Sequence, residues 1–591
     1  MDSPGPASQT SPPRMPSRKG IAAMPQTAEK KTAEPQTVGQ MLAASLSAQG
    51  VDTIFCVPGE SYLGLTDALG EYPDIRLVVC RHEGGAGFMA AADGRMRPGQ
   101  PGVLLVSRGP GATNAMIALH TAYHDATPLV ALIGHVERKD VGRLALQEQN
   151  YSRLLSDMTK AVFEVIEPIQ ASEVIARAFH LARSGTPGPV AVILPEDIFD
   201  EPAEGPVLPA RILPRPGPRP DDLDRLAEML ERAERPLVLV GGAMAACGPE
   251  ALPDLNRLAE AWCLPISPTH RRPHLFDANH PNYGGYFGIR IPKPLIEEMK
   301  KADLMVCLGE RLSDSISQSY SFPAAPQPQL PLVQVWPDPN EIGRVWQVDL
   351  PIAADPHAVI QGLLARNAPE PSEGRRAWVR GLNRIHRELL APEWERMEDG
   401  VNFAAVCAAA ARHVPEDAAI TSDAGNFGSF LHRYFPFRQT QVFLSSNVGA
   451  MGAAVPMAVA AALRRPGKRA VAFVGDGGVL MTGNEIATAM REGVAPVIII
   501  SDNGTYGTIG MHHEGRYPGR PYDAATSLVN PDFVAWARSF GAAGLCIAAE
   551  EEVDAVLAQA FAITDRPVVV HVKASAVQTS AWRKRSMPLP G

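Results

Sequence analysis

Two residues that could hold a metal ion stand 27 positions apart in the last third of the chain, Asp476 and Asn503. Each follows a short apolar run, at 470–474 and 494–500, of the kind that forms a buried parallel strand. Because adjacent parallel strands end at the same edge of a sheet, we expect the two side chains to lie together there. A carboxylate and a carboxamide oxygen suit a hard divalent cation such as Mg²⁺.

Asp476 belongs to the glycine-rich turn Gly475-Asp476-Gly477-Gly478, and a helix is predicted at 483–491. Glycine backbone lets a diphosphate approach closely, and the amide groups at a helix start attract anions. The same turn also fits a plain strand-to-helix connection that binds no ligand. The residue types therefore indicate a metal and diphosphate site, with an unliganded turn as the alternative.

A third chemistry-bearing residue, Glu83, lies about 400 positions earlier. It follows a predicted strand at 76–80 and precedes a helix of small residues at 86–95. The glycines beside Glu83 leave room for a planar ring to approach its carboxylate. The alternatives are that Glu83 is a surface residue, or that it caps the helix through the helix dipole.

These segments resemble the thiamine diphosphate enzymes of the acetolactate synthase and pyruvate oxidase family. The resemblance rests on the glycine-rich turn followed by Asn503 and on three segments of the first third: Phe55-Cys56-Val57-Pro58-Gly59, His82-Glu83-Gly84-Gly85-Ala86 and Gly109-Pro110-Gly111-Ala112-Thr113-Asn114. It implies that Asp476, Asn503 and the main-chain carbonyl of Thr505 hold Mg²⁺. It also implies that Glu83 faces N1′ of the aminopyrimidine, so that the cofactor removes its own C2 proton.

The resemblance assigns further residues to the cofactor. The segment 422–427 matches one that contacts the diphosphate and the ring, and 447–452 matches one that supports the pyrimidine. Met451 takes the place of the apolar wedge that bends the cofactor, although a methionine also serves as a core filler. The full predicted set of cofactor-binding residues is Pro58, Gly59, Glu83, Ala424, Gly425, Asn426, Phe427, Gly449, Met451, Gly475, Asp476, Gly477, Gly478, Asn503, Thr505, Tyr506, Gly507 and Thr508.

The residues that would contact the substrate are less well defined. Gln147, with Glu83 one of two predicted catalytic residues, lies in a segment similar to the family's Phe-Gln-Glu…Thr-Lys; a solvated loop is the alternative. Tyr506 and Ile509 are expected to line the pocket, but the family's pyruvate-condensing synthases usually show Leu-Gly-Met-Val there. Four histidines are further candidates, with core packing or a hydrated loop as the alternative: His124, His135, His512 and His513.

Alternating strands and helices predict an α/β protein with three doubly wound parallel-sheet domains. Seven prolines between Glu201 and Asp221 mark an extended linker. The expected division is a disordered tail at 1–35 (a targeting peptide is the alternative), a pyrimidine-binding domain at 36–200, the linker at 201–221, a central domain at 222–366, a more helical linker at 367–400, a diphosphate- and Mg-binding domain at 401–575, and a tail or clasp at 576–591.

Composition excludes several classes of function. A net charge of −9 argues against a nucleic-acid surface, and no apolar run is long enough for a membrane span. Seven cysteines without a Cys-x-x-Cys pair are expected to be free thiols in the cytoplasm. No glycine turn has the pattern of a nicotinamide dehydrogenase.

The family resemblance implies a thiamine diphosphate- and Mg²⁺-dependent carboligase acting on a 2-oxo acid. The alternatives are a decarboxylase or C–C lyase without ligation, and a silent paralogue that only binds the cofactor. A homodimer or homotetramer with sites between chains is implied. Some relatives hold FAD in the central domain; Gly309-Glu310-Arg311-Leu312-Ser313-Asp314 resembles their segment with altered residues, so FAD is possible but not favoured.

Overall fold

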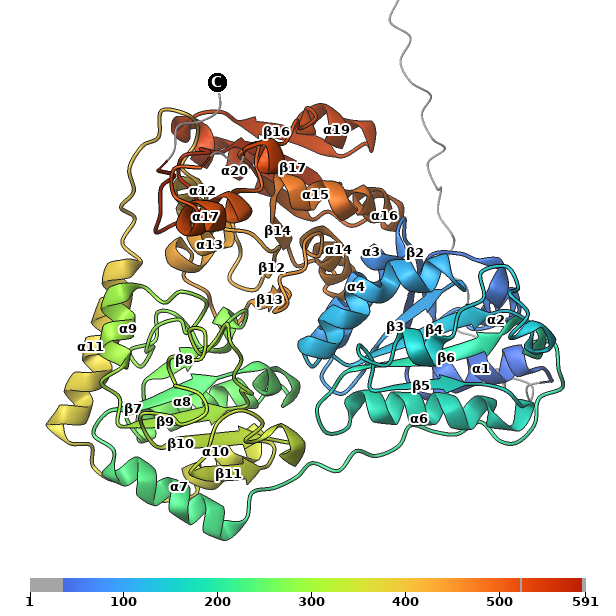
Figure 1. The fold of residues 1–591 in the computed structure, drawn as a ribbon, viewed down its shortest axis with the longest axis horizontal. Coiled ribbons are helices and arrows are strands. Elements are labelled where there is room, and N and C mark those ends of the chain that lie inside the picture. Colours follow the sequence, from blue (N-terminus) through green and yellow to red (C-terminus); the bar gives the residue numbers. More distant parts are fainter. Residues whose placement is uncertain (1–35, 521–522, 587–591) are drawn as a thin grey trace, which may run out of the picture.

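Short apolar runs that end in glycine or polar turns form the strands of three parallel sheets. The computed structural model describes residues 36–520 and 523–586 and contains three α/β domains (Figure 1). The three-domain doubly wound fold predicted from the sequence is therefore confirmed. The predicted disordered tail at 1–35 lies outside the described residues.

The first domain is built on a six-stranded parallel sheet in the order β2-β1-β3-β4-β6-β5. Its strands are β1 (Thr53–Cys56), β2 (Arg76–Val79), β3 (Gly102–Val106), β4 (Leu129–His135), β5 (Ala161–Glu164) and β6 (Pro189–Pro195). Its helices are α1 (Val38–Ala48), α2 (Leu63–Leu69), α3 (Glu83–Met96), α4 (Pro110–His124), α5 (Tyr151–Leu154) and α6 (Ala171–Arg183). The edge strand β5 was not predicted; its apolar run, Ala161-Val162-Phe163, is only three residues long, and no residue of the strand is fully buried.

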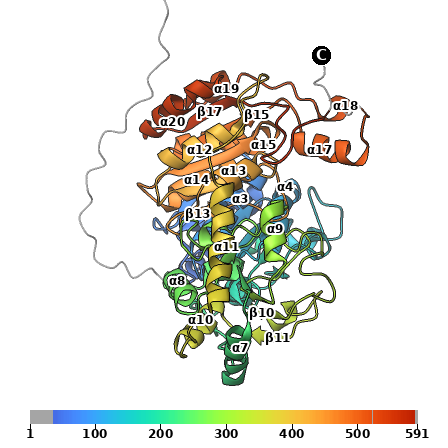
Figure 2. The same cartoon turned by 90° about the vertical axis from the view of Figure 1, so that its left-hand side faces the viewer.

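The central domain has a five-stranded parallel sheet in the order β11-β10-β9-β7-β8. Its strands are β7 (Pro236–Val240), β8 (Ile266–Pro268), β9 (Leu304–Leu308), β10 (Leu332–Trp336) and β11 (Leu350–Ala353). Its helices are α7 (Pro220–Arg232), α8 (Ala251–Ala261), α9 (Lys293–Met299) and α10 (Pro356–Leu364). Helix α11 (Glu373–Leu389) then rises along the outside of this domain toward the third (Figure 2).

The third domain repeats the plan of the first, with six parallel strands in the order β13-β12-β14-β15-β17-β16. Its strands are β12 (Ala419–Ser422), β13 (Val442–Leu444), β14 (Ala470–Gly475), β15 (Val497–Asp502), β16 (Ala543–Ile547) and β17 (Val568–Lys573). Its helices are α12 (Phe403–His413), α13 (Gly428–Tyr434), α14 (Ala454–Arg464), α15 (Asp476–Thr482), α16 (Ile486–Glu492), α17 (Gly507–Arg516), α18 (Asp523–Thr526), α19 (Phe533–Ser539) and α20 (Val553–Ala562).

Helices α3 and α14 pack against each other and join the first domain to the third (Figure 1). Both are rich in alanine and glycine, whose small side chains let two helices approach closely. Their buried residues belong to one continuous apolar cluster that extends into both sheets. The two domains therefore share a core, which fixes their relative position.

An ion-pair cluster around the buried carboxylate of Asp93 reinforces this contact. Arg464, at the end of α14, donates from Nε to Asp93 of α3 (2.6 Å) and from Nη1 and Nη2 to Asp52 (2.8 Å each). Asp93 is 1% exposed, so water cannot replace a lost partner. Arg97 gives Asp93 a second, longer contact of 3.3 Å.

Arg464→Ala is expected to destabilise the protein by about 3 kcal/mol, because it leaves the buried Asp93 carboxylate poorly paired. The measurement is the midpoint of thermal unfolding. Arg412→Ala serves as the control, since Arg412 and Asp554 form an exposed pair whose loss should leave the midpoint unchanged. Equal midpoints for both variants would show that the cluster does not stabilise the contact.

Candidate active site

The candidate site lies where strands β12, β14 and β15 end, at the carboxyl edge of the third sheet. β14 is hydrogen-bonded to both of the others, so Asp423, Asp476 and Asn503 follow neighbouring strands. α15 begins at Asp476 itself, directly after β14, and the helix predicted at 483–491 continues as α16. Strand β15 begins and ends two to three residues later than the predicted run at 494–500.

A cavity of about 220 Å³ opens at this edge. Every cofactor-binding residue predicted in the third domain lines it: Ala424, Gly425, Asn426, Phe427, Gly449, Met451, Gly475, Asp476, Gly477, Gly478, Asn503, Thr505, Tyr506, Gly507 and Thr508. Ile509, expected to line the pocket, does so as well. The segments that the family resemblance assigned to the cofactor therefore surround one cavity.

Two glycines of the turn have no room for a side chain. A Cβ on Gly477 would lie 2.5 Å from the Tyr506 ring, and one on Gly478 would lie 2.3 Å from Asp423 Oδ2. Gly449 has a φ of +70°, which disfavours other residues. Packing against Tyr506 and Asp423 therefore requires glycine at 477 and 478, and these residues line the cavity, where their backbone is available to a diphosphate.

Asp476 is almost fully buried, and its oxygens are held from two sides. Oδ1 accepts from the Gly477 amide (2.9 Å) and Oδ2 accepts from Asn530 Nδ2 (2.8 Å). The same Asn530 nitrogen donates to Asp502 (2.7 Å), whose other oxygen lies 2.7 Å from His571 Nε2. Burial raises the pKa of Asp476, so a bound cation would stabilise its charged form.

Asp423 organises the opposite wall. It is fully buried and accepts from the amides of Gly452 (2.6 Å), Ala453 (2.7 Å) and Ala454 (3.1 Å), at the start of α14. Burial raises its pKa to about 6. Asp423 therefore ties the segment that carries Met451 to the end of β12, a role that its place in the predicted diphosphate segment did not reveal.

Glu83 does not line the cavity within one chain. It is the first residue of α3 and is half-buried, and Asn114 of α4 donates to its Oε2 (2.9 Å). The helix begins three residues earlier than predicted, and its cap is His82, whose Nδ1 accepts from the Gly84 amide (3.0 Å). His82 is therefore the N-cap, while Glu83 lies in the first turn, where a carboxylate also interacts favourably with the helix dipole; both interpretations of Glu83 stay open.

The other predicted residues of the first domain also lie away from this cavity. Pro58 and Gly59 form the turn after β1, where a Cβ on Gly59 would lie 2.4 Å from Ser107 Cβ. Gln147 is exposed, with a φ of +66°, and packs against Gly109. None of these residues is among those that line the cavity in the described part of the chain.

None of the four candidate histidines is among the described residues that line the cavity. His135 is buried against Tyr151, with ring centroids 5.0 Å apart, and burial lowers its pKa. His124 is exposed and stacks edge-on with His120. His512 is exposed on α17, and His513 on the same helix is half-buried.

Comparison with known proteins gives three consecutive matches to models of one family. They are the N-terminal TPP binding domain of thiamine pyrophosphate enzymes at 36–154, the central domain at 223–363 and the C-terminal TPP binding domain at 423–572. The chain belongs to the thiamine pyrophosphate enzymes. The resemblance stated from the sequence is thereby confirmed.

Relatives of the chain within this family carry one activity in their names. The acetolactate synthase of Mycobacterium bovis is 31% identical over 545 residues, which cover 90% of this chain and 87% of the relative. The acetolactate synthase isozyme 3 large subunit of Escherichia coli is 30% identical, covering 88% and 92%. A probable acetolactate synthase large subunit of Methanocaldococcus jannaschii is 29% identical, covering 90% and 91%.

The cavity of this thiamine pyrophosphate enzyme has the donor set of a hard-cation site. Within 36–520 and 523–586, His, Cys, Asp and Glu side chains form no group of three or more that could hold a metal. The predicted ligands, Asp476, the Asn503 carboxamide and the Thr505 carbonyl, offer the oxygens that Mg²⁺ prefers. The residues fit the cofactor and its cation.

The C-terminal segment of this family member also lines the cavity, through Ser575, Gln578 and Thr579. Ser575 donates to Asp399 (2.7 Å), and Arg433 donates to the Ala581 carbonyl (2.7 Å). Up to residue 586 the segment is therefore a clasp rather than a free tail. The segment follows β17, a parallel neighbour of β15 whose carboxyl end lies at the same edge of the sheet. Because neighbouring parallel strands end at one edge, the sequence could have indicated that residues just after β17 lie near the site.

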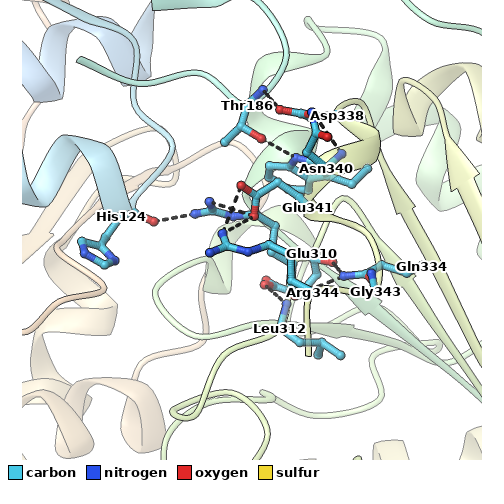
Figure 3. Close-up of polar contacts among 12 residues, drawn as sticks. His124, Thr186, Glu310, Leu312, Gln334, Asp338, Asn340, Glu341, Gly343 and Arg344 are labelled. Carbon is cyan, nitrogen blue, oxygen red and sulfur yellow. Dashed lines mark hydrogen bonds and ion pairs between the residues drawn. The ribbon is translucent and has the colours of Figure 1, made fainter. Parts of the chain in front are cut away.

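The segment that resembles the family's flavin-binding loop is engaged in protein contacts (Figure 3). Arg311 donates to the His124 carbonyl of the first domain (2.6 Å), pairs with Glu341 (3.7 Å) and lies over the Trp336 ring. Glu310 accepts from the Leu312 amide (3.0 Å). Arg311 therefore joins the first and central domains, and FAD stays a possible but unfavoured cofactor.

Among the described residues, no helix has the length and apolarity needed to cross a membrane.

Proposed function

We propose that this enzyme is a thiamine diphosphate- and Mg²⁺-dependent carboligase of the acetolactate synthase type, acting on a 2-oxo acid. The observation that carries the proposal is the single cavity lined by every predicted cofactor residue of the third domain. Relatives named acetolactate synthase, matched over about nine-tenths of the chain, support it. Assay of CO₂ and acetolactate from pyruvate, with Mg²⁺ and thiamine diphosphate, tests it.

Each residue has a distinct task in this proposal. Asp476, Asn503 and the Thr505 carbonyl hold Mg²⁺, and the amides of the glycine turn bind the diphosphate. Met451 supports the bent cofactor from the cavity wall. When bound, the cofactor supplies an electron sink for the carbanion left by decarboxylation. Glu83 exchanges a proton with N1′ of the aminopyrimidine, and Gln147 contacts the substrate.

A homodimer is the smallest active unit in this proposal, with Glu83 of one chain facing Asp476 of the other; a homotetramer pairs two such dimers. Two observations support it. Glu83 lies outside the cavity of its own chain. Large apolar side chains are also exposed on α4 and α15: Ile117 (46%), Leu480 (47%) and Met481 (48%).

Mixing two inactive chains tests the shared site. Glu83→Gln and Asp476→Ala chains are each expected to be inactive alone. When they are co-expressed, half of the dimers combine both chains and each holds one intact site, so activity should return to about a quarter of the wild-type value. Failure of activity to return, with mixed dimers demonstrated by tagged purification, would place each site within one chain.

A second function within the same cofactor class is a decarboxylase or C–C lyase that releases the product without ligation. The segment after Asn503 favours keeping this candidate, because Tyr506 and Ile509 line the cavity where the synthases usually have other residues. CO₂ with an aldehyde instead of acetolactate would identify it. Neither CO₂ nor product from a panel of 2-oxo acids would indicate a silent cofactor-binding paralogue.

We also propose that the protein is cytoplasmic. All seven cysteines are free thiols in the structure, and five of them are buried. Free thiols are typical of a reducing compartment.

Asn530→Ala is expected to weaken Mg²⁺ binding about 10- to 100-fold, because Asn530 orients the Asp476 carboxylate without being a ligand itself. Titration of Mg²⁺ in the presence of thiamine diphosphate, followed by tryptophan fluorescence, measures the change. Asn279→Ala, at an exposed asparagine of the central domain, is the control. An unchanged Mg²⁺ affinity in Asn530→Ala would show that Asn530 does not orient the Asp476 carboxylate for the cation.

A further inference from the structure

Glu485 is a fully buried carboxylate of the third domain that contacts the first domain of the same chain. It ends the short 3-10 helix η8 (Gly483–Glu485) between α15 and α16. Oε1 accepts from the main-chain amides of Arg81 and His82 (3.0 Å each), and Oε2 from the Arg81 amide (3.2 Å) and the Thr488 hydroxyl. The contact thus involves residues about 400 positions apart.

The local structure is shaped to admit this carboxylate. A Cβ on Gly85 would lie 2.5 Å from Glu485 Oε1, so only glycine leaves the space. The two amides that donate to Glu485 immediately precede α3, whose first residue is Glu83. A negative group at the start of a 14-residue helix also interacts favourably with the helix dipole.

Two contacts therefore determine where Glu83 points. Glu485 holds the backbone just before it, and Asn114 holds its side-chain oxygen (2.9 Å). The backbone contact comes from a different domain than the side-chain contact. Loss of Glu485 should leave Glu83 present but free to change direction.

We propose that Glu485 is a positioning residue for Glu83, acting through the amides of Arg81 and His82. The inference rests on the proposed function, in which Glu83 exchanges a proton with the cofactor. Glu485 follows Asp476 by nine positions, and in the proposed dimer the Glu83 and Asp476 of one chain serve different sites. Each chain would thus link the metal-binding helix of one site to the proton-transfer group of the other.

The first experiment needs no cofactor. In Glu485→Gln, loss of the negative charge weakens both hydrogen bonds, and a side-chain NH₂ replaces the oxygen that accepts from Thr488 and from the Arg81 amide, so amide hydrogen exchange at Arg81 and His82, measured by mass spectrometry, should become at least about tenfold faster. Glu492→Gln is the matched control, because Glu492 crosses the same domain contact through Arg76 but does not touch these amides. Unchanged exchange in Glu485→Gln, or equal acceleration in both variants, would overturn the proposal.

The second experiment measures hydrogen–deuterium exchange at C2 of thiamine diphosphate with the protein saturated by cofactor and Mg²⁺. Glu485→Gln should slow this exchange about tenfold or more while the cofactor's dissociation constant stays within about threefold. The reason is that a misplaced Glu83 carboxylate slows proton transfer without weakening cofactor binding. Gly85→Ala keeps the Glu485 carboxylate but pushes it away, so this variant should also slow C2 exchange without changing the cofactor's dissociation constant. Wild-type exchange in both folded variants would overturn the proposal.

Glu83→Gln in the same assay distinguishes failure of the Glu485 positioning role from failure of the proposed role of Glu83. If Glu83→Gln slows C2 exchange and Glu485→Gln does not, only the positioning role fails. If Glu83→Gln itself exchanges at the wild-type rate, the proposed role of Glu83 fails, and the positioning role fails with it.

Discussion

Glu83→Gln is expected to lower the rate of C2 hydrogen–deuterium exchange in bound thiamine diphosphate by at least about 100-fold, with cofactor affinity nearly unchanged. Glutamine has the size of glutamate and can still accept from Asn114, so the local structure should persist. It cannot exchange a proton with the aminopyrimidine. Quenched-flow labelling followed by proton NMR of the extracted cofactor measures the rate.

Glu60→Gln is a suitable control for this result, because Glu60 is an exposed carboxylate of the same domain that pairs with Arg108. Its exchange rate should match that of the wild type. A wild-type rate in Glu83→Gln would show that another group transfers the proton. Loss of cofactor binding instead would indicate that the carboxylate anchors the ring.

Asp476→Ala is expected to weaken the binding of Mg²⁺ and thiamine diphosphate by more than about 100-fold, because it removes the only predicted charged ligand of the cation. The fold should survive. The substitution removes a buried carboxylate whose pKa is already raised by burial, and Asn530 keeps its hydrogen bond to Asp502. Isothermal titration with Mg²⁺ and cofactor, alongside a thermal melt of the unliganded protein, measures both effects.

Asp532→Ala provides a control at a nearby aspartate that caps α19 and does not line the cavity in the described residues. Its cofactor affinity should equal that of the wild type. Tight binding of Mg²⁺ to Asp476→Ala would show that the cation is held elsewhere. A large loss of thermal stability would show that Asp476 is chiefly structural.

The strands that carry Asp476 and Glu83 could be predicted because their signals are local. A run such as 470–474 must be buried on both faces, and the glycines after it allow a turn that few other residues accept. Parallel strands then bring their ends to one edge whatever the rest of the chain does. The thiamine diphosphate site follows from these local patterns and from the family's residue types.

Contacts across large sequence separations could not be predicted in this way. Asn530 precedes a proline and a helix cap, which indicates only a turn, yet it holds the oxygen of Asp476. Ala581 follows the last strand in a stretch without periodicity, yet its carbonyl accepts from Arg433. Such roles depend on packing between elements, for which adjacent residues carry no signal.

The sequence by itself determined the fold class and the edge of the sheet at which the predicted cofactor residues gather, because both depend on short-range patterns of apolar residues and glycine; the cofactor family followed from the resemblance of the motifs at these strand ends. Only the tertiary structure decided that the C-terminal segment up to residue 586 is a clasp, that Glu83 lies outside its own chain's cavity, and that Glu485 holds the backbone beside it. The contact of Glu485 depends on how the shared core of α3 and α14 sets the first and third domains against each other, and the clasp depends on contacts with Asp399 and Arg433; both are properties of the packed whole.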